Sequence, residues 1–279
     1  MIKTIKPTKQ TMHYYWAYRK LLVRFVSKMS LIVKRRLFDL LPKLDDKYEI
    51  KPVDLSHMKN DDEVLGVFSA IQSDYSFLLD EFRPEVFSLL VQMKEADKKK
   101  FYKQLDDRYG LSLAGILEKE NIKDSFALAV EQNLDLIKSL SEKQLNRVKN
   151  VVLSDLRAGS FDAHSIREML IHEFGVTTRH AEFIARDQSH KMTSTLDALR
   201  VQNLGCTKYI WRTAKDRRVR GDPTGKYPNA RPSHYAREGK TFTYAKPPEG
   251  GNPGEDYNCR CYAESILPDD IAELIPKRT

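Results

Sequence analysis

The stretch that decides the fold lies near the C-terminus, where short β-like runs alternate with turn-rich segments. Residues 209–213 read YIWRT, residues 239–244 read GKTFTY and residues 258–264 read NCRCYAE. Aromatic and β-branched residues alternate with polar ones in the first two runs, which is typical of half-buried strands. Pro and Gly fill residues 221–225 and 247–254 and predict loops there. We therefore expect a short antiparallel sheet built from these three runs.

Upstream of these three runs, apolar residues recur at the spacing of helices. Three residues predict breaks between them. Pro84 is expected to begin a new helix, Ser141 opens a capping box with Gln144, and Gly175 is expected to end a helix. The helices predicted in this way are 61–82, 84–108, 111–119, 123–139, 141–159, 163–174 and 179–205.

The fold class predicted from this order is α+β, with a helical N-terminal region followed by a small α+β domain of three helices and the short sheet. Low periodicity and Pro52 predict a linker at 45–60. The domains expected are a basic amphipathic arm (1–43), a helical domain (61–139), an independently folded C-terminal domain (141–268) and a tail (269–279).

The net charge of +8 is concentrated at the N-terminus, where residues 1–43 hold eleven Lys or Arg and one acidic residue. Leu22, Phe25, Val26, Met29, Val33 and Leu37 recur there at helical spacing. The basic residues between them, which we take as candidate contacts to a partner or to DNA, are Arg24, Lys28, Lys34, Arg35 and Arg36. Such a helix can dock on the protein's own body, on a partner subunit, or on DNA phosphates or a membrane surface. Its apolar runs are far shorter than the roughly twenty residues of a spanning helix, so we expect no membrane span.

His234, Cys259 and Cys261 are candidate zinc ligands, because imidazole and thiolate are the donors that zinc prefers. The spacing of the two cysteines argues against this, since structural zinc sites usually separate paired cysteines by two to four residues. A fourth ligand would come from Cys206 or Asp216. The alternative is that the cysteines are small buried residues and the histidine is a hydrogen-bonded turn residue.

No Walker loop and no Gly-x-Ser-x-Gly sequence occurs in the chain, so we assign no catalytic residue and expect no enzyme. Asp187 and His190 share one helical face and could pair with Arg186, or with Arg218 and Arg220, as a buried polar brace. Trp211 is expected to anchor the core between helices and sheet.

These residues follow one another in an order that resembles the phage Mu F-like minor head protein family, over roughly residues 145 to 268. The motif residues that carry the resemblance are Asp187, Trp211, Asp216, Arg218, Arg220, Gly239 and Asn258, together with His234 and the two cysteines. The resemblance implies a structural minor head protein of a tailed phage or prophage, which acts in head morphogenesis and in DNA packaging or ejection. It would assemble in the bacterial cytoplasm and reside in the virion head. The implied partners are the portal protein, the major capsid or scaffold protein, and packaged DNA, with no small-molecule substrate.

Two other functions remain open at this point. One is a metal-dependent nucleic-acid enzyme that uses Asp187, Asp216, His234 and the cysteines. The other is a DNA-binding accessory factor that acts through residues 3–36, whose Lys and Arg side chains suit phosphate contacts.

Overall fold

A computed structural model describes residues 3–8, 12–38, 61–110, 123–158 and 163–273. The linker predicted at 45–60 and the helix predicted at 111–119 lie outside these residues, as does most of the predicted tail. The chain forms two compact units: unit 1 contains Met1–Tyr15, Leu90–Ala129 and Arg186–Thr279, and unit 2 contains Trp16–Leu89 and Val130–Ala185. Each unit is described by itself below.

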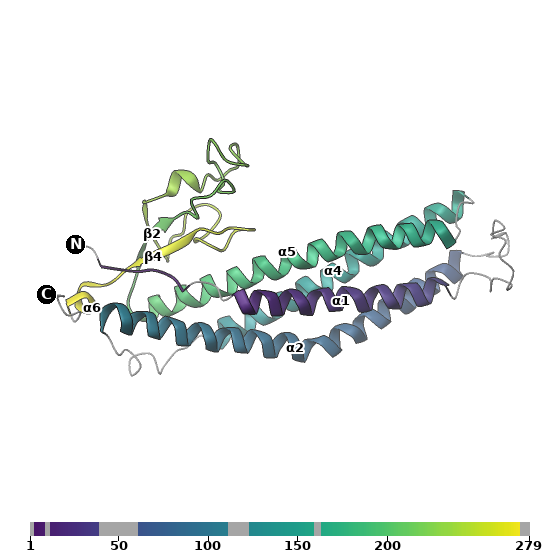
Figure 1. The fold of residues 1–279 in the computed structure, drawn as a ribbon, viewed down its shortest axis with the longest axis horizontal. Coiled ribbons are helices and arrows are strands. Elements are labelled where there is room, and N and C mark those ends of the chain that lie inside the picture. Colours follow the sequence, from purple (N-terminus) through teal and green to yellow (C-terminus); the bar gives the residue numbers. More distant parts are fainter. Residues whose placement is uncertain (1–2, 9–11, 39–60, 111–122, 159–162, 274–279) are drawn as a thin grey trace. The chain divides into compact units, whose positions relative to one another are not determined.

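The described chain consists mainly of four long helices and a small antiparallel sheet (Figure 1), which confirms the predicted α+β class. The long helices are α1 (Met12–Phe38), α2 (Asp61–Tyr109), α4 (Lys123–Ala158) and α5 (Ala163–Asn203). The strands are β1 (Thr4–Ile5), β2 (Lys208–Arg212), β3 (Thr241–Thr243) and β4 (Tyr262–Ile266). A single 3-10 turn, η2 (Tyr235–Arg237), and the short helix α6 (Asp269–Glu273) complete the described elements.

The break predicted at Pro84 was wrong, because α2 continues through it. Proline removes one backbone hydrogen bond inside a helix and destabilises it. Here the buried stripe runs on past the proline, through Phe82, Val86 and Leu90. Packing of this stripe therefore outweighs the local cost.

The helix start predicted at Ser141 was also wrong, since Ser141 lies inside α4. Its hydroxyl donates to the Lys138 carbonyl at 2.7 Å, as a mid-helix serine does, instead of capping a new helix. Gln144 is buried and accepts a 2.7 Å hydrogen bond from the Tyr75 hydroxyl. The domain boundary placed there on the basis of the capping box stays a prediction.

Gly175 does not end a helix either, because α5 runs through it without interruption. The hydroxyls of Thr177 and Thr178 donate to the carbonyls of Glu173 and Phe174, at 2.7 and 2.8 Å. These hydroxyls bond within the helix, so they do not supply the cap that the sequence suggested. The three helices expected before the sheet are consequently parts of two, α4 and α5.

The described residues of unit 2 are all helical and include most of α1, whose stripe of apolar residues from Leu22 to Leu37 is buried. Phe25 packs edge-on against Phe82 of α2, and the Tyr18 hydroxyl donates to Asn133 of α4 at 2.7 Å. Of the alternatives for the basic amphipathic helix, docking on the protein's own body is therefore the one that the structure shows.

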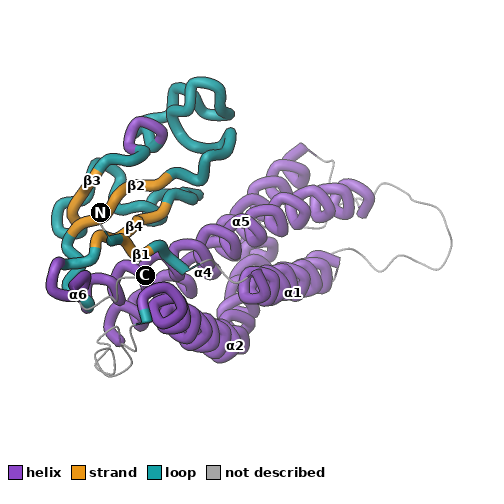
Figure 2. The backbone as a smooth tube through the Cα atoms, turned by 60° about the vertical axis from the view of Figure 1, so that its left-hand side comes forward, coloured by secondary structure: helices purple, strands orange, loops and turns teal. Residues whose placement is uncertain are grey.

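Unit 1 holds the sheet, whose strands lie in the order β1-β4-β2-β3 with every pair antiparallel (Figure 2). The sequence did not indicate β1, because two residues are too few to show alternation. It joins the sheet by pairing Thr4 with Ile266 and Ile5 with Ser265 of β4. The third predicted strand began too early, since β4 starts at Tyr262, after both cysteines.

A buried polar network fixes the N-terminal segment in unit 1. Thr8 donates from its backbone N–H to Asp197 and from its hydroxyl to Asp97, both at 2.6 Å, and Arg200 pairs with Asp97. Arg200 is completely buried. Burial, and then the nearby Asp97 carboxylate, raise the pKa of Asp197 well above its usual value. Unpaired charges this deep would be costly, so the network holds residues 3–8 as part of the fold and not as a free arm.

A substitution in β1 tests this placement. Ile5 is 1% exposed and belongs to the core of unit 1. Ile5→Ala should lower the free energy of unfolding by about 2–5 kcal/mol, through lost burial and the cavity left behind. Chemical denaturation measures the change. The matched control is Leu128→Ala, which removes a side chain that is 60% exposed in the same unit and should change stability by less than about 0.5 kcal/mol. Equal effects of the two substitutions would place β1 outside the core.

Candidate functional site

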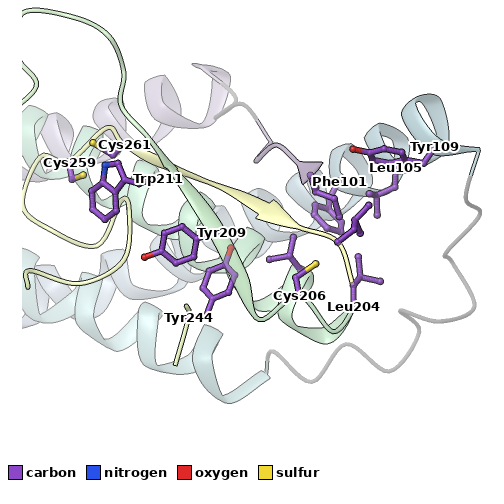
Figure 3. Packing of buried hydrophobic residues seen from close by; sticks show 13 residues of the cluster. Phe101, Leu105, Tyr109, Leu204, Cys206, Tyr209, Trp211, Tyr244, Cys259 and Cys261 are labelled. Carbon is purple, nitrogen blue, oxygen red and sulfur yellow. The ribbon is translucent and has the colours of Figure 1, made fainter. Parts of the chain in front are cut away.

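The site is built around Trp211, which β2 directs into the core of unit 1, beside the two cysteines (Figure 3). The ring of His234 meets the indole edge-on, with centroids 5.2 Å apart. The guanidinium of Arg237 lies 4.9 Å from the centroid of the same indole ring. The predicted role of Trp211 as a core anchor agrees with this burial, and the indole also supports a histidine and an arginine.

His234, Cys259 and Cys261 are brought together as one buried group. The Nδ1 atom of His234 lies 3.5 Å from the Cys259 Sγ and 3.6 Å from the Cys261 Sγ. One ligand atom of each residue can be chosen so that all three lie within 4.8 Å of one another. Within the described part of the chain, this is the one group of His, Cys or acidic side chains placed closely enough to hold a metal ion.

The two thiols of this group differ in their electrostatics. A hydrogen bond from Cys261, followed by one from His234, lowers the pKa of Cys259. The same hydrogen bond to Cys259, together with burial, raises the pKa of Cys261. Cys206 lies elsewhere in the core, and burial raises its pKa to about 12, so it stays a protonated thiol at neutral pH. The third cysteine is therefore outside the group.

Asp256 supports the histidine from its other side. The Nε2 atom of His234 lies 3.5 Å from the Asp256 carboxylate, which is also paired with Arg220. The other oxygen of Asp256 accepts the Tyr257 backbone N–H at 2.7 Å. Nothing in the sequence pattern singled out Asp256, because it lies in a turn-rich segment with no periodicity.

Two further carboxylates hold the turn that carries the cysteines. Asp216 forms a two-pronged ion pair with Arg260 and accepts the Arg218 backbone N–H at 2.9 Å. Asp187 of α5 accepts the Asn258 backbone N–H at 2.7 Å and lies 3.0 Å from Lys191. Asp187 holds the backbone of Asn258. It does not pair with Arg218 or Arg220 as the sequence suggested, because Arg218 faces Asp216 and Arg220 faces Asp256.

Gly239 closes the loop between Trp211 and the end of η2. Its φ of 75° lies in the left-handed region that glycine adopts without strain. In this conformation its N–H donates to the Trp211 carbonyl at 2.9 Å, and the Trp211 N–H donates to the Lys240 carbonyl at 2.8 Å. The adjacent Glu238 accepts the Thr213 N–H at 2.6 Å. These bonds fix the backbone on both sides of the indole.

A cavity of about 240 Å³ opens onto the group. Its lining includes three arginines, two tyrosines and the three residues of the His234–Cys259–Cys261 group: Arg218, Arg220, Arg260, Tyr227, Tyr257, His234, Cys259 and Cys261.

Two residues beside the group have roles that the sequence pattern did not indicate. Arg260 lies between the two cysteines and pairs with Asp216. His190 lies on α5 near Cys259 and Cys261, and burial lowers its pKa.

The five basic residues of α1 are not equivalent. Arg24, Lys28 and Arg36 pair with Glu85, Glu81 and Asp74 of α2. Lys34 and Arg35 are exposed. Contact of these residues with a partner or with DNA stays a prediction.

Residues 146–264 match the protein family described as phage Mu protein F like protein. This confirms the resemblance seen in the sequence, and the family is one of phage head-related proteins. The chain is also 34% identical over 178 residues to a protein of Haemophilus influenzae described as uncharacterized, a match that covers 63% of this chain. The chain spans about a third of that relative, since the match covers 36% of it.

No solved structure matches the chain. Among the helices described, none is long and apolar enough to cross a membrane.

The two tryptophans allow a matched test of the phage Mu F-like segment. Trp211→Ala should lower the free energy of unfolding by about 3–5 kcal/mol, because the ring is 1% exposed. Trp16, at 52% exposed, provides the control, and Trp16→Ala should cost much less. Thermal and chemical denaturation measure both. A Trp211→Ala protein that melts like the wild type would show that the indole does not anchor the core.

Acid titration tests the Asp216–Arg260 pair. The hydrogen bond from Arg260 lowers the pKa of Asp216 below its ordinary value, which is about 3.9. The pair therefore contributes stability above about pH 4, and this contribution is lost as the pH falls through the lowered pKa. Arg260→Gln should return the pKa of Asp216 toward its ordinary value, as seen by carboxyl NMR titration. Because the Asp216 side chain is 36% exposed, the stability difference at neutral pH should be about 1 kcal/mol or less. Arg231→Gln, at an exposed arginine of a nearby loop, should leave the titration unchanged.

Proposed function

We propose that the chain is a structural minor head protein of a tailed bacteriophage or prophage, which acts in head morphogenesis at the portal vertex. The observation that carries the proposal is the family match over residues 146–264. The motif residues in this segment build a braced turn around Trp211, through backbone hydrogen bonds and ion pairs. Residues used in this way serve architecture, as expected of a protein whose task is assembly.

The metal-dependent nucleic-acid enzyme is less well supported. That function would need Asp187 and Asp216 to share a metal with His234 and the cysteines. Asp187 instead holds the Asn258 backbone, and Asp216 holds Arg260. We therefore assign no catalytic residue.

The DNA-binding function through residues 3–36 is weakened because three of the basic residues form internal ion pairs. Each of Arg24, Lys28 and Arg36 faces a carboxylate of α2, which offsets its attraction for phosphates. Beside Lys34 and Arg35, the groove between α1 and α2 exposes Leu31 (65%) and Phe77 (72%). Large exposed apolar side chains with basic neighbours suit a protein partner better than a nucleic acid, and we propose the portal protein as that partner.

Incorporation into heads tests the function and the surface together. In a phage or prophage that carries this gene, purified heads should contain the wild-type protein, as measured by mass spectrometry. Leu31→Asp with Phe77→Asp should reduce incorporation at least about tenfold if these contacts supply 1.4 kcal/mol or more. Leu128→Asp, at an exposed leucine of unit 1, is the control and should incorporate normally.

Three outcomes would contradict the proposal in different ways. Heads that lack the wild-type protein would exclude a head protein. Normal incorporation of the double variant would move the recruitment surface elsewhere. Salt-dependent DNA binding by the purified protein that is lost in Lys34→Glu with Arg35→Glu would favour the accessory-factor function.

A further inference from the structure

We propose that His234, Cys259 and Cys261 bind a zinc ion through Nδ1 and the two Sγ atoms. All three side chains belong to unit 1 and are nearly or completely buried. They come from two separate segments, one immediately before η2 and one immediately before β4. The proposal concerns this chain's own chemistry and does not depend on its role in a phage head.

The two sulfur-to-nitrogen distances in this group agree with tetrahedral zinc. Bonds of about 2.3 Å to sulfur and about 2.0–2.1 Å to nitrogen place a sulfur and a nitrogen about 3.6 Å apart at the tetrahedral angle. The two sulfur-to-nitrogen distances in the structure are 3.5 and 3.6 Å. Both sulfurs approach the same ring nitrogen, as one shared ion requires.

The spacing of the cysteines, which argued against zinc in the sequence, is not an obstacle in the structure. That argument used spacing alone, and the sequence also predicted a strand through both cysteines. They instead precede β4, in a turn where Asn258 has a φ of 52° and the Cys259 N–H donates to the Asp256 carbonyl at 3.0 Å. In this turn both side chains reach the Nδ1 atom of His234.

The remaining ring nitrogen of His234 faces the kind of group to which metal-binding histidines usually donate. Histidines that bind zinc typically donate their other N–H to a carboxylate, which fixes the tautomer. The Nε2 atom is buried and makes no hydrogen bond in the structure, and the nearest carboxylate is that of Asp256, 3.5 Å away and paired with Arg220. Asp256 is therefore close enough to accept this N–H after a small side-chain adjustment, and we assign it as a positioning residue.

Charge and local architecture both favour an ion at this place. Two thiolates and one Zn²⁺ sum to zero charge, so the loaded group can be buried without an unpaired charge. The segments 213–234 and 244–261 contain almost no regular structure, and a metal that joins them would supply a cross-link that backbone hydrogen bonds do not. Neither Cys206 nor Asp216 belongs to the group, so solvent from the adjoining cavity would fill the fourth position.

Metal analysis of the full chain, purified under reducing conditions without added chelator, tests the site directly. We expect about one zinc ion per chain by mass spectrometry of the metal. X-ray absorption at the zinc edge should show two sulfur ligands at about 2.3 Å and a nitrogen at about 2.0–2.1 Å. This measurement needs no variant, so it remains decisive even if a substituted chain fails to fold.

The three cysteines provide matched variants. Cys259→Ser and Cys261→Ser should each lose the zinc, whereas Cys206→Ser, the same change in the same unit but outside the group, should retain it. Asp256→Asn should weaken zinc binding by about 10–100-fold in competition with a chromophoric chelator. Asp222→Asn, in an exposed loop, should leave the affinity unchanged.

Several results would overturn the proposal. Freshly purified protein without bound metal that also fails to take up added zinc would do so. A disulfide between Cys259 and Cys261 in that protein would show that the pair is a redox group instead. Zinc that survives both serine substitutions, or that is lost equally in Cys206→Ser, would place the ion elsewhere.

Discussion

The turn at residues 256–261 is held by carboxylates of other segments. The arrangement of the side chains around this turn depends on these contacts. Asp187 accepts the Asn258 N–H from α5, and Asp216 grips Arg260 from the loop after β2. Asn258 can adopt its left-handed φ at small cost, since asparagine tolerates this region better than most residues. With the backbone fixed in this way, the side chains of Cys259 and Cys261 both face His234. The site is thus a consequence of how one turn is held.

The same principle explains why so many charged residues are buried near the sheet. The sheet of unit 1 is small, and its strands are two to five residues long. Long loops must therefore be fixed by side chains, and a buried polar group is tolerated only when it is paired. Arginine serves this purpose well because its planar fork can bind a carboxylate at two points, as Arg260 does with Asp216.

How much the sequence could predict depended on whether a feature is local. Periodicity located the helical regions and the β2 and β3 strands, because burial of one face repeats along the chain. Pro84, Ser141 and Gly175 misled because local signals for helix ends were overridden by a continuous buried face. Strand β1 could not be predicted from the sequence, because its pairing with β4 joins residues at opposite ends of the chain. In the candidate site, the chemistry of the side chains was enough to single out His234 and the two cysteines. The proximity of Asp256 to the histidine could be known only from the fold.

The core of unit 1 also bears on what the matched segment needs in order to fold. Residues 146–264 contain Trp211, both site cysteines and β2, β3 and most of β4. Ile5, Phe101, Leu105 and Tyr109 of the same core lie outside that segment. The Tyr109 hydroxyl donates to the Thr4 carbonyl, so α2 also holds β1 at the edge of the sheet. A fragment that begins near residue 140 would leave the apolar surface beneath these residues in water, at a cost of about 25 cal/mol for each Å² exposed. Residues 1–15 and 90–129 are therefore structural parts of the unit that carries the motif, and its core includes contacts that the matched segment alone does not contain.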